Sequence, residues 1–225
     1  MFAEAGCGDH LTEEAVKHVK QPDLICVLPG QTDQAIIVGA HFDKVQAGDG
    51  VADNWSGASL LPSLYQGLCS ASTRHTFIFV AFTGEETGEL GSRAYVHRMS
   101  QDDVERTEAM VNMDTLGLGS TQMWLSHADP QLAEALRAVA KALNLPLGVV
   151  NVDGAGSSDS EQFARRKIRR ITIHSVTQQT WPILHSPQDN MKAMHLDDYY
   201  ESYQLIQGYL VFLDGALEKS GVKSQ

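Results

Sequence analysis

The stretch that decides the fold of this chain is Thr76–Phe82, which reads TFIFVAF. It is a continuous run of apolar, β-forming residues, and such a run is typical of a strand buried on both faces. A second run of the same kind, residues 35–40 (AIIVGA), comes earlier and ends at His41. Two buried strands of this type predict a mostly parallel sheet with helices on both faces.

Outward from these two strands, the chain alternates between strand-like runs and helix-like periodic patterns. The further strands are predicted at Asp23–Leu28 and at residues 109–113, 123–126, 147–152 and 168–175, and the helices at residues 56–67, from Glu85-Glu86 to about Met99, from Asp129-Pro130 onward, and at residues 196–217. This order predicts an α/β fold, a three-layer α/β/α sandwich around a mixed, mostly parallel sheet. Because no linker or repeat interrupts the pattern, we expect residues 1–225 to form a single domain.

The charge balance argues against one class of partner. The chain has 17 Lys and Arg against 28 Asp and Glu, a net charge of −11. A negative surface repels phosphate backbones, so we expect no nucleic-acid partner. No apolar stretch of about 18 residues is present, so the sequence predicts no membrane span. The acidic excess has two interpretations, solubility or carboxylates gathered to hold cations.

The three cysteines leave the redox state open. Cys7, Cys26 and Cys69 form no C-x-x-C pair, which argues against a thiolate metal site. One interpretation is a Cys7–Cys26 disulfide with Cys69 left over. Buried free thiols are at least as compatible with the sequence.

Acidic and imidazole side chains follow the predicted strands. They are His41 and Asp43 after residues 35–40, Asp53 in the crossover to the next helix, Glu85 and Glu86 after Thr76–Phe82, Asp114 after residues 109–113, and His185 in a loop after the last strand. Ligands of open α/β sheets bind at the carboxyl ends of strands, so we expect these residues to gather at one edge. Carboxylates gathered there would repel one another unless cations lay between them. Imidazole with carboxylate is a ligand set that suits zinc.

Five separated segments give the chain a family resemblance. They are residues 38–43 (VGAHFD), 50–57 (GVADNWSG), 84–92 (GEETGELGS), 112–114 (NMD) and 185–189 (HSPQD). In this order they resemble the dizinc aminopeptidase family (clan MH), which includes bacterial leucyl aminopeptidases, glutamate carboxypeptidase II and the glutaminyl cyclases. The resemblance extends from about Leu24 to the C-terminal helix.

The resemblance implies a role for each residue at the sheet edge. Asp53 is expected to bridge two zinc ions (Zn2+, two per chain), with His41 and Asp114 completing one metal site and Glu86 and His185 the other. Glu85 is expected to be the general base, which takes a proton from water and passes it to the leaving amine. Two such cations can lower the pKa of a shared water and polarise a carbonyl group.

Three further residues are expected near the site. Asp43 lies two residues from His41 and is the natural acceptor for its other ring N–H. Asp159 resembles part of a Ser-Asp pair found near the active site of the family, although a helix cap explains it equally well. Trp181 is expected either to wall the substrate pocket or to lie in the core.

The function implied is an aminopeptidase that hydrolyses N-terminal residues from peptides with a free N-terminus. The alternatives are a glutaminyl cyclase-like acyltransferase, a carboxypeptidase or dipeptidase on the same scaffold, and a non-catalytic receptor-like relative. The complete ligand set disfavours the last, and the segments at residues 53–57 and 84–88 disfavour the cyclase.

The resemblance also implies secretion or a periplasmic location. Residues 1–9 contain neither the basic start nor the apolar run of a signal peptide. Family members usually have a further helix before the position of residues 2–6, so we expect the chain to begin within that helix.

Overall fold

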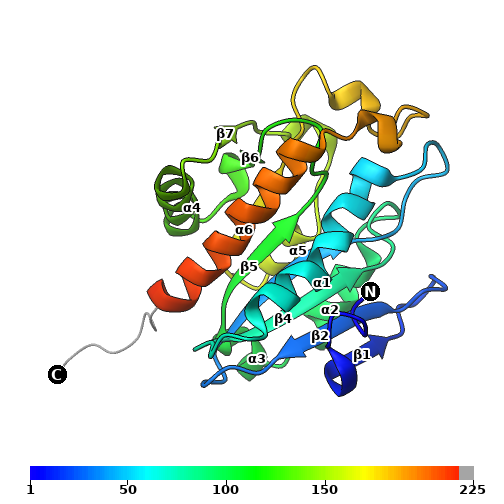
Figure 1. Ribbon diagram of the computed structural model, residues 1–225. Coiled ribbons are helices and arrows are strands. Elements are labelled where there is room, and N and C mark those ends of the chain that lie inside the picture. Colours follow the sequence, from blue (N-terminus) through cyan, green and yellow to red (C-terminus); the bar gives the residue numbers. More distant parts are fainter. Residues whose placement is uncertain (218–225) are drawn as a thin grey trace.

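A mixed sheet of eight strands forms the centre of the structure, a computed structural model that describes residues 1–217 (Figure 1). The strands are β1 (Leu11–Glu14), β2 (Asp23–Leu28), β3 (Ala35–His41), β4 (Thr76–Phe82), β5 (Thr107–Met113), β6 (Gln122–Met123), β7 (Gly148–Val149) and β8 (Arg170–His174). Their order across the sheet is β1-β2-β4-β3-β5-β8-β6-β7. The pairings β3 with β4, β3 with β5, β5 with β8 and β6 with β7 are parallel, and the other three are antiparallel. This confirms the predicted α/β fold with a mixed, mostly parallel sheet.

The central strand is β3, and all seven of its residues are buried. It pairs in parallel with β4 on one side and β5 on the other, with His41 opposite Phe82. A side chain at Gly39 would place its Cβ 2.6 Å from the Phe82 ring and 2.7 Å from Met110. Glycine therefore lets large side chains of the neighbouring strands cross over the middle of β3.

Helices cover both faces of the sheet, as predicted (Figure 1). One layer consists of α1 (Ser56–Leu68), α4 (Pro130–Leu143) and α6 (Leu196–Ala216), and the other of α2 (Leu90–Arg98), α3 (Gln101–Arg106) and α5 (Ser160–Ala164). The larger hydrophobic core lies under the first layer and includes Leu61, Leu136 and Tyr209. The smaller core lies under the second layer, around Phe82 and Phe163. Burial on both faces explains why the central strands are apolar throughout.

Several element boundaries differ from the prediction. α2 begins only at Leu90, because Gly88 and Glu89 both have positive φ and break the helix after Glu85-Glu86. α3 was not predicted, and it starts at a capping box between Ser100 and Asp103. The predicted strands at 123–126 and 147–152 are reduced to the two-residue β6 and β7. The edge strand β1 was also missed, since its four residues carry little apolar signal.

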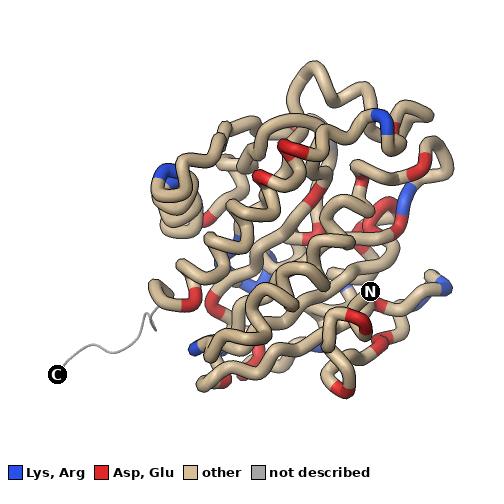
Figure 2. The backbone as a smooth tube through the Cα atoms, in the orientation of Figure 1, with Lys and Arg blue, Asp and Glu red and all other residues tan. Residues whose placement is uncertain are grey.

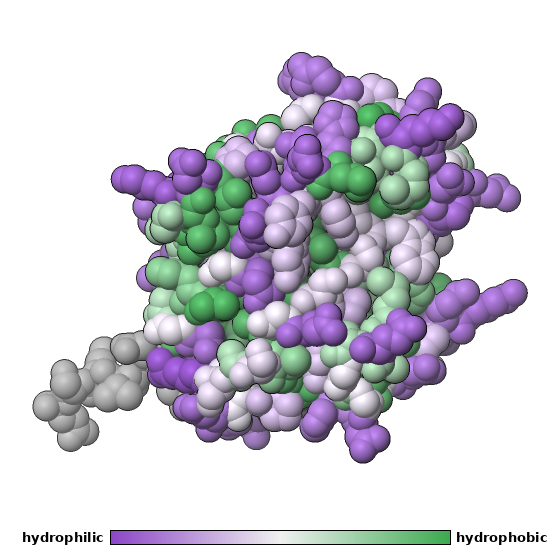
Figure 3. Space-filling model, in the orientation of Figure 1, coloured by the Kyte–Doolittle hydropathy of each residue, from purple (hydrophilic) through white to green (hydrophobic). Residues whose placement is uncertain are grey.

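The surface of the α1 and α6 face mixes hydrophobic and hydrophilic residues (Figure 3). Tyr200, Val211 and Phe212 of α6 are exposed, and single apolar side chains of this kind are common on the surfaces of folded proteins. Among residues 1–217, no helix has both the length and the apolar character needed to cross a bilayer.

One disulfide ties the N-terminal segment to the sheet. Cys7 and Cys26 are bonded, with 6.1 Å between their Cα atoms, and both are fully buried. Of the two interpretations of the cysteines, the Cys7–Cys26 bridge is the one that the structure contains. Cys69 is free and exposed.

The disulfide predicts a measurable loss of stability on its removal. Cys7 and Cys26 are 19 residues apart, and closing a loop of that length restricts the unfolded chain. Replacing both with serine is expected to lower the free energy of unfolding by about 3 kcal/mol. Urea unfolding followed by circular dichroism measures this, with Cys69→Ser as the control. Equal midpoints for the double variant and the control would contradict the prediction.

Candidate metal centre

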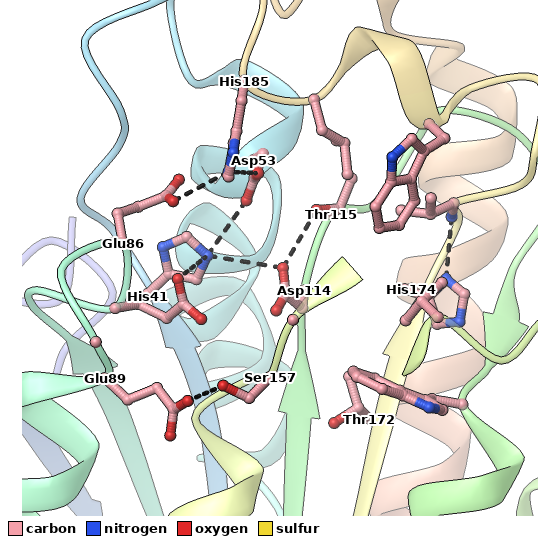
Figure 4. Close-up of a pocket in the computed structure, with 18 residues that line it drawn as sticks. His41, Asp53, Glu86, Glu89, Asp114, Thr115, Ser157, Thr172, His174 and His185 are labelled. Atoms are coloured by element: carbon pink, nitrogen blue, oxygen red, sulfur yellow. Dashed lines mark hydrogen bonds and ion pairs between the residues drawn. The ribbon is translucent and has the colours of Figure 1, made fainter. Parts of the chain in front are cut away.

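The predicted site residues lie at one edge of the sheet, where the parallel strands end. His41 is the last residue of β3, Asp114 follows the end of β5, and Glu85 and Glu86 lie in the turn after β4. Acidic segments gather where these strands end (Figure 2). Asp53 and His185 arrive from loops that cross this edge (Figure 4).

Asp53 lies between two imidazoles. Its Oδ1 is 3.3 Å from Nε2 of His41, and its Oδ2 is 3.3 Å from Nε2 of His185. The residue is 7% exposed. Each carboxylate oxygen therefore faces a different ring nitrogen, which is the arrangement expected of a ligand shared by two cations.

Two groups of three ligand atoms share Asp53. His41, Asp53 and Asp114 form one group, and Asp53, Glu86 and His185 form the other, with all ligand atoms of a group within 4.8 Å of one another. In the first group, Nε2 of His41 is 3.6 Å from Oδ1 of Asp114. In the second, Nε2 of His185 is 3.0 Å from Oε2 of Glu86. The structure thus brings the five predicted ligands together in the predicted sets.

Glu85 stands beside the first group. Its Oε2 is 4.0 Å from Nε2 of His41, and the side chain lines the adjoining cavity. Burial raises the pKa of the Glu85 carboxyl far above its ordinary value. From its place in the cavity wall, Glu85 can exchange a proton with a group bound in the cavity.

The charges of this edge suit divalent cations. Burial opposes ionisation of Asp53, yet hydrogen bonds to His185 and His41 outweigh burial and lower its pKa. The hydrogen bond to Asp53 raises the pKa of His185 to about 9, and burial raises the pKa of Glu86 to about 7. The second carboxylate oxygen of Glu86 is buried and has no hydrogen-bond partner among the residues that the structure describes. The imidazole and carboxylate donors gathered here are those that a zinc ion takes.

Asp43 contacts the site at two places, the ring of His41 and the backbone of Glu85 and Glu86. Nδ1 of His41 lies 3.2 Å from the backbone oxygen of Asp43 and 3.6 Å from its carboxylate. The carboxylate also accepts hydrogen bonds from the amides of Glu85 and Glu86, at 3.0 and 3.2 Å. Asp43 thus joins the end of β3 to the turn after β4, and it leaves Nε2 of His41 free to face Asp53.

Asp189 is a structural partner of Asp53 to which the sequence analysis gave no role. Its buried carboxylate accepts hydrogen bonds from the amide of Ala52 at 2.7 Å and from the amide of Asp53 at 3.3 Å. It lies four residues after His185, so it fixes the His185 loop to the loop that carries Asp53. Asp189 is the last residue of the segment 185–189, and its place in that segment was the sequence signal that could have identified it.

Asn54 makes a similar connection to the end of β5. Its side-chain oxygen accepts hydrogen bonds from the backbone amides of Gly57 and Thr115, both at 3.0 Å. Its side-chain NH2 group donates a hydrogen bond to the carbonyl of Met113 at 2.9 Å. These bonds hold the residue beside Asp53 against both neighbours of Asp114.

Asp159 is fully buried and lies near Glu85 and Asp114. The helix-cap interpretation is wrong, because its side chain makes no cap hydrogen bond to α5. Both carboxylate oxygens lack a hydrogen-bond partner in the described part of the chain, and burial raises the pKa of Asp159 to about 7.

A cavity of about 310 Å³ opens beside the metal-ligand groups (Figure 4). Besides the residues above, its lining includes Thr115, Trp124, Val152, Thr172, His174, Val176, Trp181 and Leu184. Trp181 is thus a cavity wall, one of its two expected places. The sequence indicates no role for His174, another residue of the cavity lining. Its Nε2 donates to the carbonyl of Val150 at 2.9 Å and its Nδ1 accepts the amide of Val176 at 3.0 Å, and burial lowers its pKa.

Known proteins resemble this chain in sequence and in fold. Aminopeptidase YwaD of Bacillus subtilis is 26% identical over 84% of this chain and 41% of its own length. A zinc aminopeptidase structure from Bacillus subtilis superposes with a TM-score of 0.78, at 22% identity, over 89% of this chain and 51% of its own. A glutaminyl cyclase structure from an Acidobacteriales bacterium gives a TM-score of 0.73, at 17% identity, over 93% of this chain and 85% of its own.

These likenesses differ in what they cover. The chain spans between 41% and 62% of the length of the curated relatives that it matches over most of its own sequence. The two structural likenesses, each below 25% identity, establish the fold. Residues 23–210 match the family described as Peptidase family M28. This chain therefore belongs to peptidase family M28.

Proposed function

We propose that the protein is a zinc-dependent aminopeptidase that removes N-terminal residues from peptides. The observation that carries this proposal is the position of Asp53, with one carboxylate oxygen toward each of two imidazoles and Glu85 close by. Membership of a peptidase family and the relatives named as aminopeptidases support it.

The proposed cofactor is a pair of zinc ions per chain. His41 and Asp114 would hold one ion, Glu86 and His185 the other, and Asp53 both. Bound there, the pair would polarise the scissile carbonyl group and make a water molecule between them more acidic.

Glu85 is proposed to move the proton. It lines the cavity and would accept the proton of the attacking water, then deliver it to the leaving amine. The amides of Glu85 and Glu86 are both held by Asp43, so the backbone of this turn is fixed while its two side chains serve different roles. Glu86 faces His185, whereas Glu85 faces His41.

The cavity beside the metal-ligand groups is the proposed place for the substrate's N-terminal residue. Trp124 and Thr172, which are 3% and 2% exposed, belong to its lining. In an aminopeptidase substrate, a single residue precedes the scissile bond. The proposed substrate is therefore a peptide with a free N-terminus.

A secreted or periplasmic location is also proposed, because the Cys7–Cys26 disulfide suits an oxidising compartment.

A product assay separates this activity from its alternatives. The zinc-loaded protein is incubated with aminoacyl peptides, with N-terminal glutaminyl peptides and with N-terminally blocked peptides, and the products are identified by mass spectrometry. Release of the free N-terminal amino acid is expected. Pyroglutamate formation would favour a cyclase, and release of the C-terminal residue from a blocked peptide would favour a carboxypeptidase.

Glu85→Gln is expected to reduce kcat by roughly 100-fold to 10,000-fold, because the amide cannot accept the proton. Zinc content is expected to stay that of the unmodified protein, since Glu85 is outside both ligand groups. Steady-state kinetics and elemental analysis measure the two quantities. Near-normal turnover with full zinc would remove Glu85 from the role of general base.

Asp53→Ala is expected to reduce the occupancy of both metal positions, because Asp53 belongs to both ligand groups. Asp114→Ala is expected to affect one position more strongly than the other. Zinc per chain after dialysis is measured by elemental analysis, with Asp49→Ala, an exposed aspartate of the same loop, as the matched control. Two retained zinc ions in Asp53→Ala would disprove the bridging role.

A further inference from the structure

Glu89 is a buried carboxylate in the cavity wall that the proposed reaction does not use. It is 6% exposed and lines the same cavity as Glu85. Its amide donates to the carbonyl oxygen of Glu85 at 2.8 Å, so the two residues lie one turn of the chain apart. A long side chain on a residue bound beside Glu85 is therefore within reach of Glu89.

The carboxylate of Glu89 has hydrogen-bond donors but, among residues 1–217, no cationic partner. The hydroxyl of Ser157 donates to one oxygen (Figure 4). The side-chain amide of Gln162 donates to the other. Arg93, four residues along the chain, donates instead to the carbonyl of Gly88 at 3.0 Å. Within residues 1–217, no Lys, Arg or His side chain forms an ion pair with Glu89. Each carboxylate oxygen can accept more than one hydrogen bond, so acceptor capacity remains for a bound group.

The rest of the cavity suits a long, largely apolar side chain. Trp124, Val152 and Val176 give it apolar walls. Lysine and arginine combine an apolar stem with a cationic head, and such stems pack along apolar surfaces while the head pairs elsewhere. A cation that reaches Glu89 would form a charge-assisted hydrogen bond shielded from water, which is stronger than a neutral one.

We propose that Glu89 selects substrates whose N-terminal residue is basic, lysine or arginine. This inference rests on the proposed aminopeptidase function, in which only one residue precedes the scissile bond. That N-terminal residue occupies the cavity, and the remainder of the peptide extends out through the cavity opening. Glu89 acts on substrate choice and leaves the metal-ligand groups unchanged.

The test compares lysyl with norleucyl anilides, because norleucine has a similar unbranched stem and no cation. The zinc-loaded protein is expected to hydrolyse the lysyl substrate with a kcat/KM at least about tenfold higher. Glu89→Gln should lower this preference by about tenfold or more, since the amide keeps the size of the side chain but loses its charge. The norleucyl substrate and the zinc content should remain nearly unchanged. Glu13→Gln, which removes an exposed charge from the edge strand β1, is the matched control.

Two results would overturn the inference: equal hydrolysis of both anilides by the unmodified protein, or an unchanged preference in Glu89→Gln. A role limited to holding Ser157 and Gln162 would lower stability and affect both substrates equally. The affinities of the unmodified zinc-loaded protein for lysinamide and norleucinamide are also measured by calorimetry. This measurement needs neither turnover nor a folded variant, and equal affinities would also refute the inference. Absence of hydrolysis of every aminoacyl substrate would instead count against the proposed function, and the binding comparison would still test Glu89.

Discussion

The carboxylate of Asp53, shared between His41 and His185, is the interaction on which the proposed activity depends. A carboxylate has two oxygens, and here each faces a different imidazole at 3.3 Å. That geometry allows one side chain to serve two cations, which leaves His41, Asp114, Glu86 and His185 to complete the two sites. Without cations between them, the carboxylates at this edge would repel one another.

The fold holds Asp53 in place from several directions. The parallel strands β3, β4 and β5 end at one edge, so residues far apart in sequence meet there. Asp189 binds the amides of Ala52 and Asp53, and Asn54 binds the backbone at Met113 and Thr115. The loops of the site are thus tied to one another and to the rigid sheet, which keeps ligand positions fixed before any cation binds.

The sequence predicted the fold class and the grouping of the site because both depend on strongly patterned segments. The apolar runs at β3 and β4 identify buried strands, and the residues that follow such strands must lie at one edge. The two-residue strands β6 and β7 and the edge strand β1 carry too little apolar signal to be distinguished from loops. The late start of α2 follows from positive φ at Gly88 and Glu89, and nothing in a single sequence shows that a glutamate adopts it. For the same reason the position of Glu89 in the cavity wall became evident only from the structure.

The most direct measurement of the central claim is anomalous X-ray diffraction from crystals of the zinc-loaded protein, recorded on both sides of the zinc absorption edge. The account predicts two zinc peaks about 3.5–4 Å apart, one on each side of the Asp53 carboxylate. A single peak bound by one imidazole, or two peaks that do not share Asp53, would contradict it.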